Sequence, residues 1–165
     1  MVNISDLINK KINKKDIDVV LDLKEFNDNY ETYKVLEPIR VKATLTKQGD
    51  VISILGLISG KIQLTCSRCL QNFSYELQLE LQEKLTNNPE NKDDEIIFIN
   101  NDKLELTEIV ENNIIMSLPI QRLCKEDCKG LCQVCGTNLN KGSCNCDNPD
   151  IDPRLAGLKD LFSNN

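Results

Sequence analysis

Eight cysteines carry most of the chemistry in this sequence of 165 residues, and they come as four close pairs. Two sulfurs held by a tight turn can reach one metal ion, and four thiolates satisfy the tetrahedral preference of zinc in a closed structural site. The sequence therefore predicts about two structural zinc ions, each with four thiolate ligands. The predicted ligands are Cys66, Cys69, Cys124, Cys128, Cys132, Cys135, Cys144 and Cys146.

Whether the cysteines bind metal or form disulfides depends on the cellular compartment, which signal and membrane segments in the sequence help to predict. Residues 1–11 lack a basic region followed by an apolar stretch, so we expect no secretory signal. The longest apolar run, 52–58, falls far short of the roughly 20 residues that span a bilayer, so we expect no membrane segment. A reducing cytoplasm disfavours disulfides. We therefore expect a cytoplasmic protein whose cysteines bind metal.

The absence of histidine removes the Ser-His and Cys-His nucleophiles and every histidine-based proton transfer. A dithiol oxidoreductase acting through Cys66 and Cys69 stays open, as does a nuclease. A two-metal nuclease needs converging carboxylates, and the tight acidic cluster 93–95 lies in a polar stretch where solvated side chains are the simpler interpretation. We expect a protein that is not an enzyme.

The net charge of −6 lies in residues 89–117, which hold eight acidic and two basic side chains. Non-specific DNA binding depends on neutralising phosphates, so an acidic chain argues against it. A local basic patch could still contact RNA. The acidic segment could instead serve a protein partner, which makes a zinc-stabilised adaptor without RNA contact the alternative.

Alternating apolar residues predict the elements that position the cysteines. Charged and apolar residues alternate over 15–26 and again over 38–47, which indicates half-buried strands. In the second strand one face is apolar and the other polar. The predicted inward residues are Ile39, Val41, Ala43 and Leu45.

The first cysteine pair is predicted to lie at the tip of a hairpin. A turn at 48–50 leads into a strand over 51–59 with Gly56 as a bulge, and a second turn at Ser59-Gly60 leads into a strand over 61–65. That strand ends directly on Cys66, and a long antiparallel strand follows the cysteine turn over 73–82.

The second half of the chain predicts a polar loop over 85–95, a short strand over 95–100 and a helix over 107–117, with Thr107 as its N-cap and Pro119 after its end. The cysteine-rich stretch has too few apolar residues for a core of its own, so metal must organise it.

The predicted fold is α+β: a mainly antiparallel sheet or partial barrel, a helix after the sheet, a cysteine-rich zinc-bound tail and a short C-terminal helix. We expect a β-rich domain over 1–118 and a zinc-binding tail over 119–165. The last helix is predicted over 153–162, where Asp152 and Pro153 supply the cap and the first position.

The motifs Cys66-Ser-Arg-Cys69, Leu118-Pro119, the cysteine-rich run over 123–140, Cys144-Asn-Cys146 and Asp152-Pro153-Arg154 follow one another in a characteristic order. Together, over about 51–161, they resemble the bacterial YceD family, whose members are called large ribosomal RNA subunit accumulation proteins. The resemblance implies a cytoplasmic factor, with plastid relatives, needed for normal synthesis or processing of 23S ribosomal RNA. Its implied partner is a ribosomal RNA precursor or a large-subunit assembly intermediate.

Four pairs can be combined into two metal sites in three ways. Some members of the family that the chain resembles carry His-x-x-x-His in place of Cys124 and Cys128 and lack the later cysteines. This favours one site made by Cys66, Cys69, Cys124 and Cys128, and a second made by Cys132, Cys135, Cys144 and Cys146. A zinc-ribbon pairing of Cys66/Cys69 with Cys132/Cys135 stays open.

Basic side chains on the polar face of the sheet and near the cysteines are the candidates for RNA contact. Arg68 is favoured, because a zinc turn would fix its backbone and its guanidinium group can grip a phosphate. Ordinary solubilising charges are the alternative interpretation. The candidates are Arg40, Lys42, Lys61, Arg68, Lys125 and Lys129, with Lys141 nearby in the tail.

Overall fold

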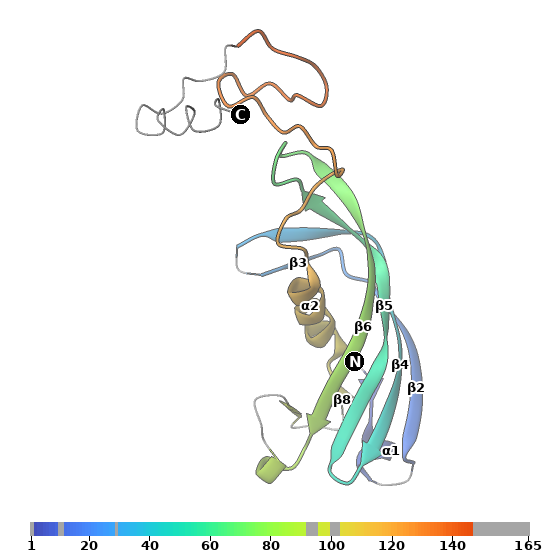
Figure 1. The fold of residues 1–165 in the computed structure, drawn as a ribbon. Helices are drawn as coiled ribbons and strands as arrows, with labels where there is room; N and C mark the ends of the chain where they lie inside the picture. The colour runs from blue at the N-terminus through green and yellow to red at the C-terminus, as the bar shows by residue number, and fades with distance from the viewer. Residues whose placement is uncertain (1, 10–11, 29, 92–95, 100–102, 147–165) are drawn as a thin grey trace, which may run out of the picture. The chain divides into compact units, whose positions relative to one another are not determined.

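The computed structural model describes residues 2–9, 12–28, 30–91, 96–99 and 103–146 (Figure 1). The chain forms two compact units. The first comprises Met1–Leu64 and Asn72–Gln121, and the second comprises Thr65–Gln71 and Arg122–Asn165. The turn that carries the first cysteine pair thus groups with the cysteine-rich tail. The predicted division into domains over 1–118 and 119–165 concerns independent folding and stays a prediction.

A six-stranded, mostly antiparallel sheet forms the main body of the first unit. Strand β4 pairs antiparallel with both β2 and β5, β5 lies beside β6, and the edge strand β7 runs parallel to β6. The strands of this sheet are β2 (Lys14–Leu21), β3 (Glu25–Asn27), β4 (Thr32–Gln48), β5 (Val51–Thr65), β6 (Asn72–Thr86) and β7 (Ile97–Phe98). The predicted fold class is confirmed.

Four short elements and one longer helix complete the described part of the first unit. Strands β1 (Val2–Asn3) and β8 (Lys103–Leu104) pair with each other, and the helix α2 (Leu106–Ser117) follows β8. The helix α1 (Ser5–Ile8) and the 3₁₀ turn η1 (Pro89–Asn91) are single turns. No helix in the described ranges is long and apolar enough to cross a membrane.

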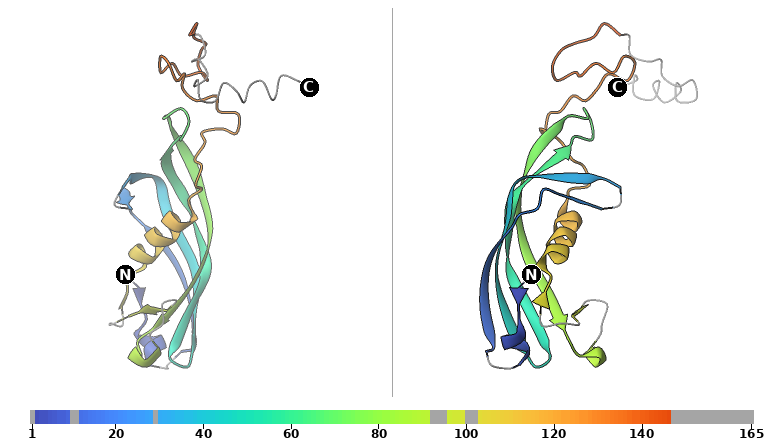
Figure 2. Two further views of the ribbon diagram at one scale, coloured as in Figure 1. Left: turned by 60° about the vertical axis from the view of Figure 1, so that its left-hand side comes forward. Right: turned by 180° about the vertical axis from the view of Figure 1, so that it is seen from behind.

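The core lies between one face of the curved sheet and α2 (Figure 2). Strand alternation puts one side of β4 into this core, and its predicted inward residues Ile39, Val41, Ala43 and Leu45 are all buried. The helix buries one stripe, made by Leu106, Ile109, Val110 and Ile114. Burying a leucine or isoleucine side chain contributes roughly 1.5–3 kcal/mol, so this face supplies the first unit with a core of its own.

The predicted turn at Ser59-Gly60 is wrong, because β5 continues through it to Thr65. Ser59 pairs with Arg40, and the irregularity lies on the partner strand, where the register shifts on either side of Glu37. The neighbouring Pro38 has no N–H to donate to a ladder, which suits it to such a break. The polar Ser-Gly pair resembles a turn in sequence, but its strand neighbours keep it extended.

Gly56 is not a bulge either, since it pairs in register with Ala43. A Cβ atom at position 56 would overlap the carbonyl oxygen of Lys42 and the side chain of Ala43. Gly56 is therefore needed because β4 approaches closely at this point.

Three further boundaries differ from the sequence prediction. The strand expected over 15–26 is divided into β2 and β3, and β7 is shorter than the predicted strand over 95–100. The helix α2 has Glu105 at its N-cap, and Thr107 lies inside the first turn with its hydroxyl donating to the Glu105 carboxylate at 3.1 Å. The helix predicted over 153–162 lies outside the described residues.

The second unit is held together mainly by turns. In its described part, 65–71 and 122–146, the pairing besides the end of β5 is one isolated bridge between Leu131 and Asn138. The buried side chains there are those of Cys66, Cys69 and Cys128. Sulfur atoms thus occupy the place that an apolar core takes in the first unit.

Candidate metal centres

The first cysteine cluster joins two segments that are far apart in the chain. Cys66 and Cys69 come from the turn after β5, and Cys124 and Cys128 come from the segment that follows α2. The Cys66–Cys69 turn closes when the N–H of Leu70 donates to the carbonyl oxygen of Cys66 at 3.0 Å. All four sulfurs lie within 4.8 Å of one another.

The sulfur distances in this cluster fit a metal ion and exclude disulfides. The Sγ atoms of Cys66 and Cys128 are 3.7 Å apart, and those of Cys69 and Cys124 are 3.6 Å apart. Zinc–sulfur bonds of about 2.3 Å in a tetrahedron put neighbouring sulfurs roughly 3.8 Å apart. A disulfide needs about 2.05 Å. The eight cysteines are free thiols, so the geometry of this donor set suits a closed tetrahedral metal site.

The thiols of the first cluster differ in their readiness to ionise. Burial disfavours the thiolate of Cys66, but hydrogen bonds from the backbone N–H groups of Cys69 and Cys124 outweigh it and lower its pKa to about 6. Burial, together with the neighbouring thiols of Cys69 and Cys128, raises the pKa of Cys124 to about 12. A dication among the sulfurs would remove this mutual repulsion, which is why a metal can ionise all four.

The second cluster is formed within the tail by Cys132, Cys135, Cys144 and Cys146, whose sulfurs also lie within 4.8 Å of one another. Its first two members sit on a knuckle in which the N–H of Gly136 donates to the carbonyl oxygen of Cys132 at 2.9 Å. Gly136 adopts a φ of 72°, a conformation that side chains resist.

The second cluster is more open to solvent than the first. Cys135 and Cys146 are exposed, whereas Cys66, Cys69 and Cys128 of the first cluster are buried. The Thr137 hydroxyl lies 3.1 Å from the Cys135 sulfur, and its hydrogen bond lowers the pKa of Cys135 to about 6. The neighbouring Cys135 sulfur raises the pKa of Cys146 to about 12.

Two backbone contacts attach the cysteine turn to the tail. Ser67 and Arg122 exchange hydrogen bonds: the N–H of Ser67 donates to the Arg122 carbonyl oxygen at 2.8 Å, and the N–H of Arg122 donates to the Ser67 hydroxyl at 3.3 Å. Gly130, which has a φ of 76°, passes close to Arg68. A Cβ atom added at position 130 would lie only 3.2 Å from the Arg68 carbonyl oxygen. The first cluster thus sits inside a network of main-chain contacts.

Sequence spacing did not identify Asn140 as part of this site. Its side-chain amide donates to the Sγ atom of Cys128 at 3.4 Å. Burial disfavours the Cys128 thiolate, but this donor and the N–H of Gly130 outweigh it and lower the pKa of Cys128. Nothing in the local sequence distinguishes Asn140 from the nearby Asn138, so only the fold of the loop reveals the contact.

The structure places the six RNA candidates in different surroundings. Arg40 makes two hydrogen bonds to the Asp18 carboxylate, at 2.7 and 2.6 Å, which raise the pKa of Arg40 and lower that of Asp18. Lys125 lies 3.5 Å from Asp127. These two cations already have carboxylate partners.

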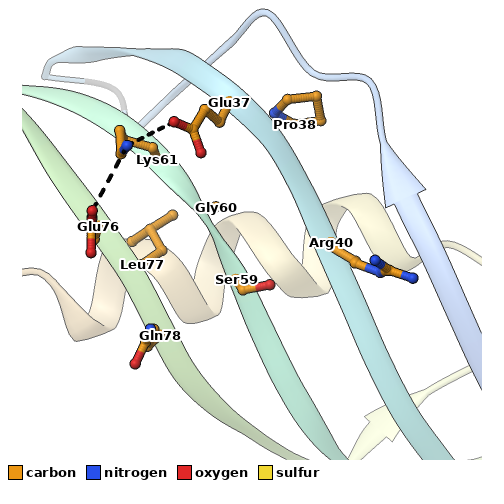
Figure 3. Close-up of a pocket in the computed structure, with 9 residues that line it drawn as sticks. All are labelled: Glu37, Pro38, Arg40, Ser59, Gly60, Lys61, Glu76, Leu77 and Gln78. Carbon is orange, nitrogen blue, oxygen red and sulfur yellow. Dashed lines mark hydrogen bonds and ion pairs between the residues drawn. The ribbon is translucent and has the colours of Figure 1, made fainter.

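Lys61 lies in a shallow polar pocket on the outer face of the sheet (Figure 3). Its ammonium group is 2.7 Å from Glu37 and 3.8 Å from Glu76, and both contacts raise the pKa of Lys61, Glu37 more strongly. Arg68 is turned to the protein as well, since its guanidinium group donates to the carbonyl oxygen of Cys128.

Lys42 and Lys129 differ from the other four candidates. Both are exposed, and neither lies within ion-pair distance of an acidic group among the described residues. They belong to different units, Lys42 to the sheet and Lys129 to the cysteine-rich tail.

Comparison with known proteins adds a family and a few distant relatives. The family model for the large ribosomal RNA subunit accumulation protein YceD matches residues 55–162, more than half of the chain and a range that includes all the cysteines. No solved structure matches the chain significantly.

Three relatives show how far the similarity extends. The uncharacterized protein YlbN of Bacillus subtilis (strain 168) is 27% identical over 150 residues, which cover 89% of this chain and 87% of the relative. The chloroplastic large ribosomal RNA subunit accumulation protein YCED homolog 1 of Arabidopsis thaliana is 21% identical over 188 residues, covering 95% of this chain and 56% of the relative. The uncharacterized protein Rv2926c of Mycobacterium tuberculosis (strain ATCC 25618 / H37Rv) is 24% identical over 116 residues, which cover 67% of this chain and 56% of the relative. This chain thus spans about half the length of the plant and mycobacterial relatives.

Proposed function

Because this chain belongs to the YceD family, we propose that it is a non-enzymatic factor that supports the accumulation of large-subunit ribosomal RNA. The observation that carries this proposal is the family match over 55–162, which covers the β5–β6 hairpin from Leu55 onward, α2 and both cysteine clusters. The finer proposal is that the protein acts in the bacterial cytoplasm on the synthesis or processing of 23S ribosomal RNA. None of the relatives described above is named as an enzyme.

Zinc in this proposal is structural. Each cluster offers four thiolates, which fill the coordination sphere of zinc and leave no open position for a substrate or a water molecule. When bound, the metal would supply the cohesion that the described part of the second unit, 65–71 and 122–146, lacks in buried apolar side chains. The first site would be held by Cys66, Cys69, Cys124 and Cys128, and the second by Cys132, Cys135, Cys144 and Cys146.

RNA contact is the part of the proposal that needs the most direct test. We propose that exposed cations bind RNA phosphates, with Lys42 and Lys129 as the principal contacts because neither forms a close ion pair among the described residues. Arg40, Lys61 and Lys125 can contribute only if phosphate displaces an acidic partner. Arg68 can contribute through the guanidinium N–H groups that its hydrogen bond to the carbonyl oxygen of Cys128 leaves over. Binding through phosphates should weaken steeply with salt.

The test combines a depletion strain with purified protein. Depletion should lower the ratio of 23S to 16S ribosomal RNA, and the wild-type chain should restore it. Purified, metal-loaded protein should retard a 23S precursor transcript on a native gel. The double variant Lys42→Glu with Lys129→Glu should no longer retard the transcript but should keep its metal. The control is Lys84→Glu, which reverses another exposed charge on the sheet and should still retard the transcript.

Two outcomes would overturn parts of the proposal. An unchanged ribosomal RNA ratio after depletion would overturn the function itself. A restored ratio with no gel shift at any salt concentration would overturn direct RNA contact and favour the zinc-stabilised adaptor.

A further inference from the structure

The side chain of Asn140 contacts the sulfur of Cys128, a member of the first cysteine cluster, and the backbone of Lys129, the residue that follows it. Its side-chain Nδ2 donates to the Sγ atom of Cys128 at 3.4 Å. Its Oδ1 accepts the backbone N–H of Lys129 at 2.9 Å. A single side chain thus holds a cysteine of the first cluster and the residue that follows it.

The orientation of this amide follows from its partners. A backbone N–H can only donate, so the atom facing Lys129 must be the oxygen of the amide. The NH₂ group then faces the sulfur of Cys128, and it also donates to the Oδ1 atom of Asn138 at 3.0 Å. Asn138 accepts the backbone N–H of Asn140 at 2.9 Å as well, which fixes the amide relative to its own turn.

The chain around Asn140 belongs to the second cluster. Asn140 lies between Cys135 and Cys144, two members of that cluster, so a metal ion there would fix both ends of the loop that carries it. The loop is also tied back toward the first cluster, because the N–H of Leu139 donates to the carbonyl oxygen of Gly130 at 3.0 Å. The position of the Asn140 amide therefore depends on the second cluster while its hydrogen bond serves the first.

We infer that Asn140 is a positioning residue that couples the two metal centres, so that metal in the second centre strengthens metal binding at the first. The inference depends on the metal sites of the proposed function and not on RNA contact. Four thiolates around one dication leave excess negative charge on the sulfurs, and an N–H donor to one of them stabilises that charge. A metal ion in the second centre would hold this donor in place beside the sulfur of Cys128.

The first test replaces the donor without changing the shape of the side chain. Asn140→Asp keeps an oxygen for the Lys129 N–H but presents an acceptor to the Cys128 sulfur. We expect it to lower the affinity of the first centre about 10-fold, the lower end of effects seen when partners of metal ligands are removed. Asn138→Asp is the matched control, because it adds the same charge two positions away and keeps the oxygen that accepts from Asn140.

Cadmium-113 NMR of the full chain separates the two centres, because each cadmium line correlates with the β-protons of its own cysteines. Asn140→Asp should shift the line that correlates with Cys128 and leave the line that correlates with Cys135 in place. A general loss of structure would move or broaden both lines. A cadmium shift at the first centre that is the same in Asn140→Asp and Asn138→Asp would overturn the positioning role.

The second test measures the coupling directly. Cys144→Ser with Cys146→Ser removes the second centre, and we expect this to weaken cadmium binding at the first centre about 10-fold. In the Asn140→Asp background, the same pair of substitutions should weaken it by less than about twofold. Equal losses in both backgrounds would overturn the coupling. Absence of any bound metal in the unsubstituted chain would instead overturn the metal sites themselves, so the two failures are distinguishable.

Discussion

The guanidinium group of Arg68 donates a hydrogen bond to the carbonyl oxygen of Cys128 at 3.0 Å, and the carbonyl oxygen of Arg68 accepts the N–H of Leu131 at 3.2 Å. Arg68 therefore grips the segment on both sides of Lys129. Arg68, which the sequence favours as a phosphate contact, thus also holds the segment that carries Cys128 of the first cysteine cluster.

Replacing Arg68 should weaken this grip. Arg68→Ala should destabilise the metal-loaded second unit by about 1 kcal/mol, the usual net contribution of one hydrogen bond. The measurement is hydrogen exchange at the amide of Leu131, which should lose protection. Lys125→Ala, which removes an exposed cation that lies 3.5 Å from Asp127, should leave that amide unchanged. Equal protection at Leu131 in the two variants would contradict the assignment.

Removing metal should unfold the second unit and spare the first. The described part of the second unit buries only cysteine side chains, whereas the first has an apolar core. Structural zinc contributes on the order of 10 kcal/mol in small domains, comparable to the stability of a whole domain. After strong chelation at pH 7, amides of 122–146 should exchange freely while those of β4 stay protected. Retained protection in 122–146 would show that the tail does not depend on metal.

Metal should leave the second cluster before the first. Cys135 and Cys146 are exposed and open to attack by a chelator, whereas three members of the first cluster are buried. A colorimetric chelator should therefore remove zinc in two phases of about one equivalent each. Cys144→Ser should abolish the fast phase. If Cys124→Ser abolished the fast phase instead, the order of release would be the reverse of that expected.

Alanine substitutions at three glycines should separate backbone strain from close packing. Gly130 and Gly136 both have positive φ, but only at Gly130 would a Cβ atom meet a neighbour, the Arg68 carbonyl oxygen at 3.2 Å. The left-handed conformation costs alanine about 1–2 kcal/mol, so both variants should bind metal more weakly. Of the two variants, Gly130→Ala should bind metal more weakly, because its Cβ atom would also crowd the Arg68 carbonyl oxygen. Gly142→Ala, where nothing lies within 4 Å, is the control in a chelator competition.

The carboxyl of Asp28 should make the stability of the first unit depend on pH. Hydrogen bonds from the backbone N–H of Glu31 and from the Tyr33 hydroxyl, at 2.8 Å each, lower its pKa below 3.8. A depressed folded-state pKa stabilises the protein above the unfolded-state pKa, and that contribution is lost as pH falls through the folded-state value. The stability difference between the wild type and Asp28→Ala should thus be full at pH 7 and shrink as the pH falls below about 4.

An NMR titration of the Asp28 carboxyl checks the cause of this shift. Protein from which metal has been removed with a chelator is suitable for this titration, because the acidic pH would remove the metal in any case. The pKa of Asp28 should be lower in the wild type than in Tyr33→Phe, which removes one donor. The same pKa in both proteins would contradict a role for the tyrosine hydroxyl.

The sequence predicted the elements whose patterns repeat over many residues. Alternation identified the buried face of β4, because a strand with one side in a core must alternate. It failed at Ser59-Gly60, where a short polar pair has turn-like chemistry but the ladder to β4 keeps the backbone extended. It also failed at Thr107, since a threonine near a helix start can hydrogen-bond from inside the first turn.

The site was predictable in its ligand types and not in its supporting contacts. Cysteine pairs are visible because two ligands on one turn have a fixed spacing. Arg68 and Asn140 both hydrogen-bond to Cys128, from 60 and 12 positions away in the chain. No local sequence pattern predicts contacts over such separations. The partner of Arg68, the carbonyl oxygen of Cys128, could therefore not be foreseen from the residues around it.

The first cluster also has a consequence for how the protein is made. Its sulfur contacts join Cys66 to Cys128 and Cys69 to Cys124, across 62 and 55 positions of the chain. At about 5–20 residues per second, a ribosome completes Cys128 roughly 3–12 s after Cys66. During that interval the β5–β6 turn presents two thiols with no partners from the tail. Newly made chains therefore pass through a stage in which a half-built site is open to oxidants and to foreign metal ions, and this stage ends only when the tail emerges.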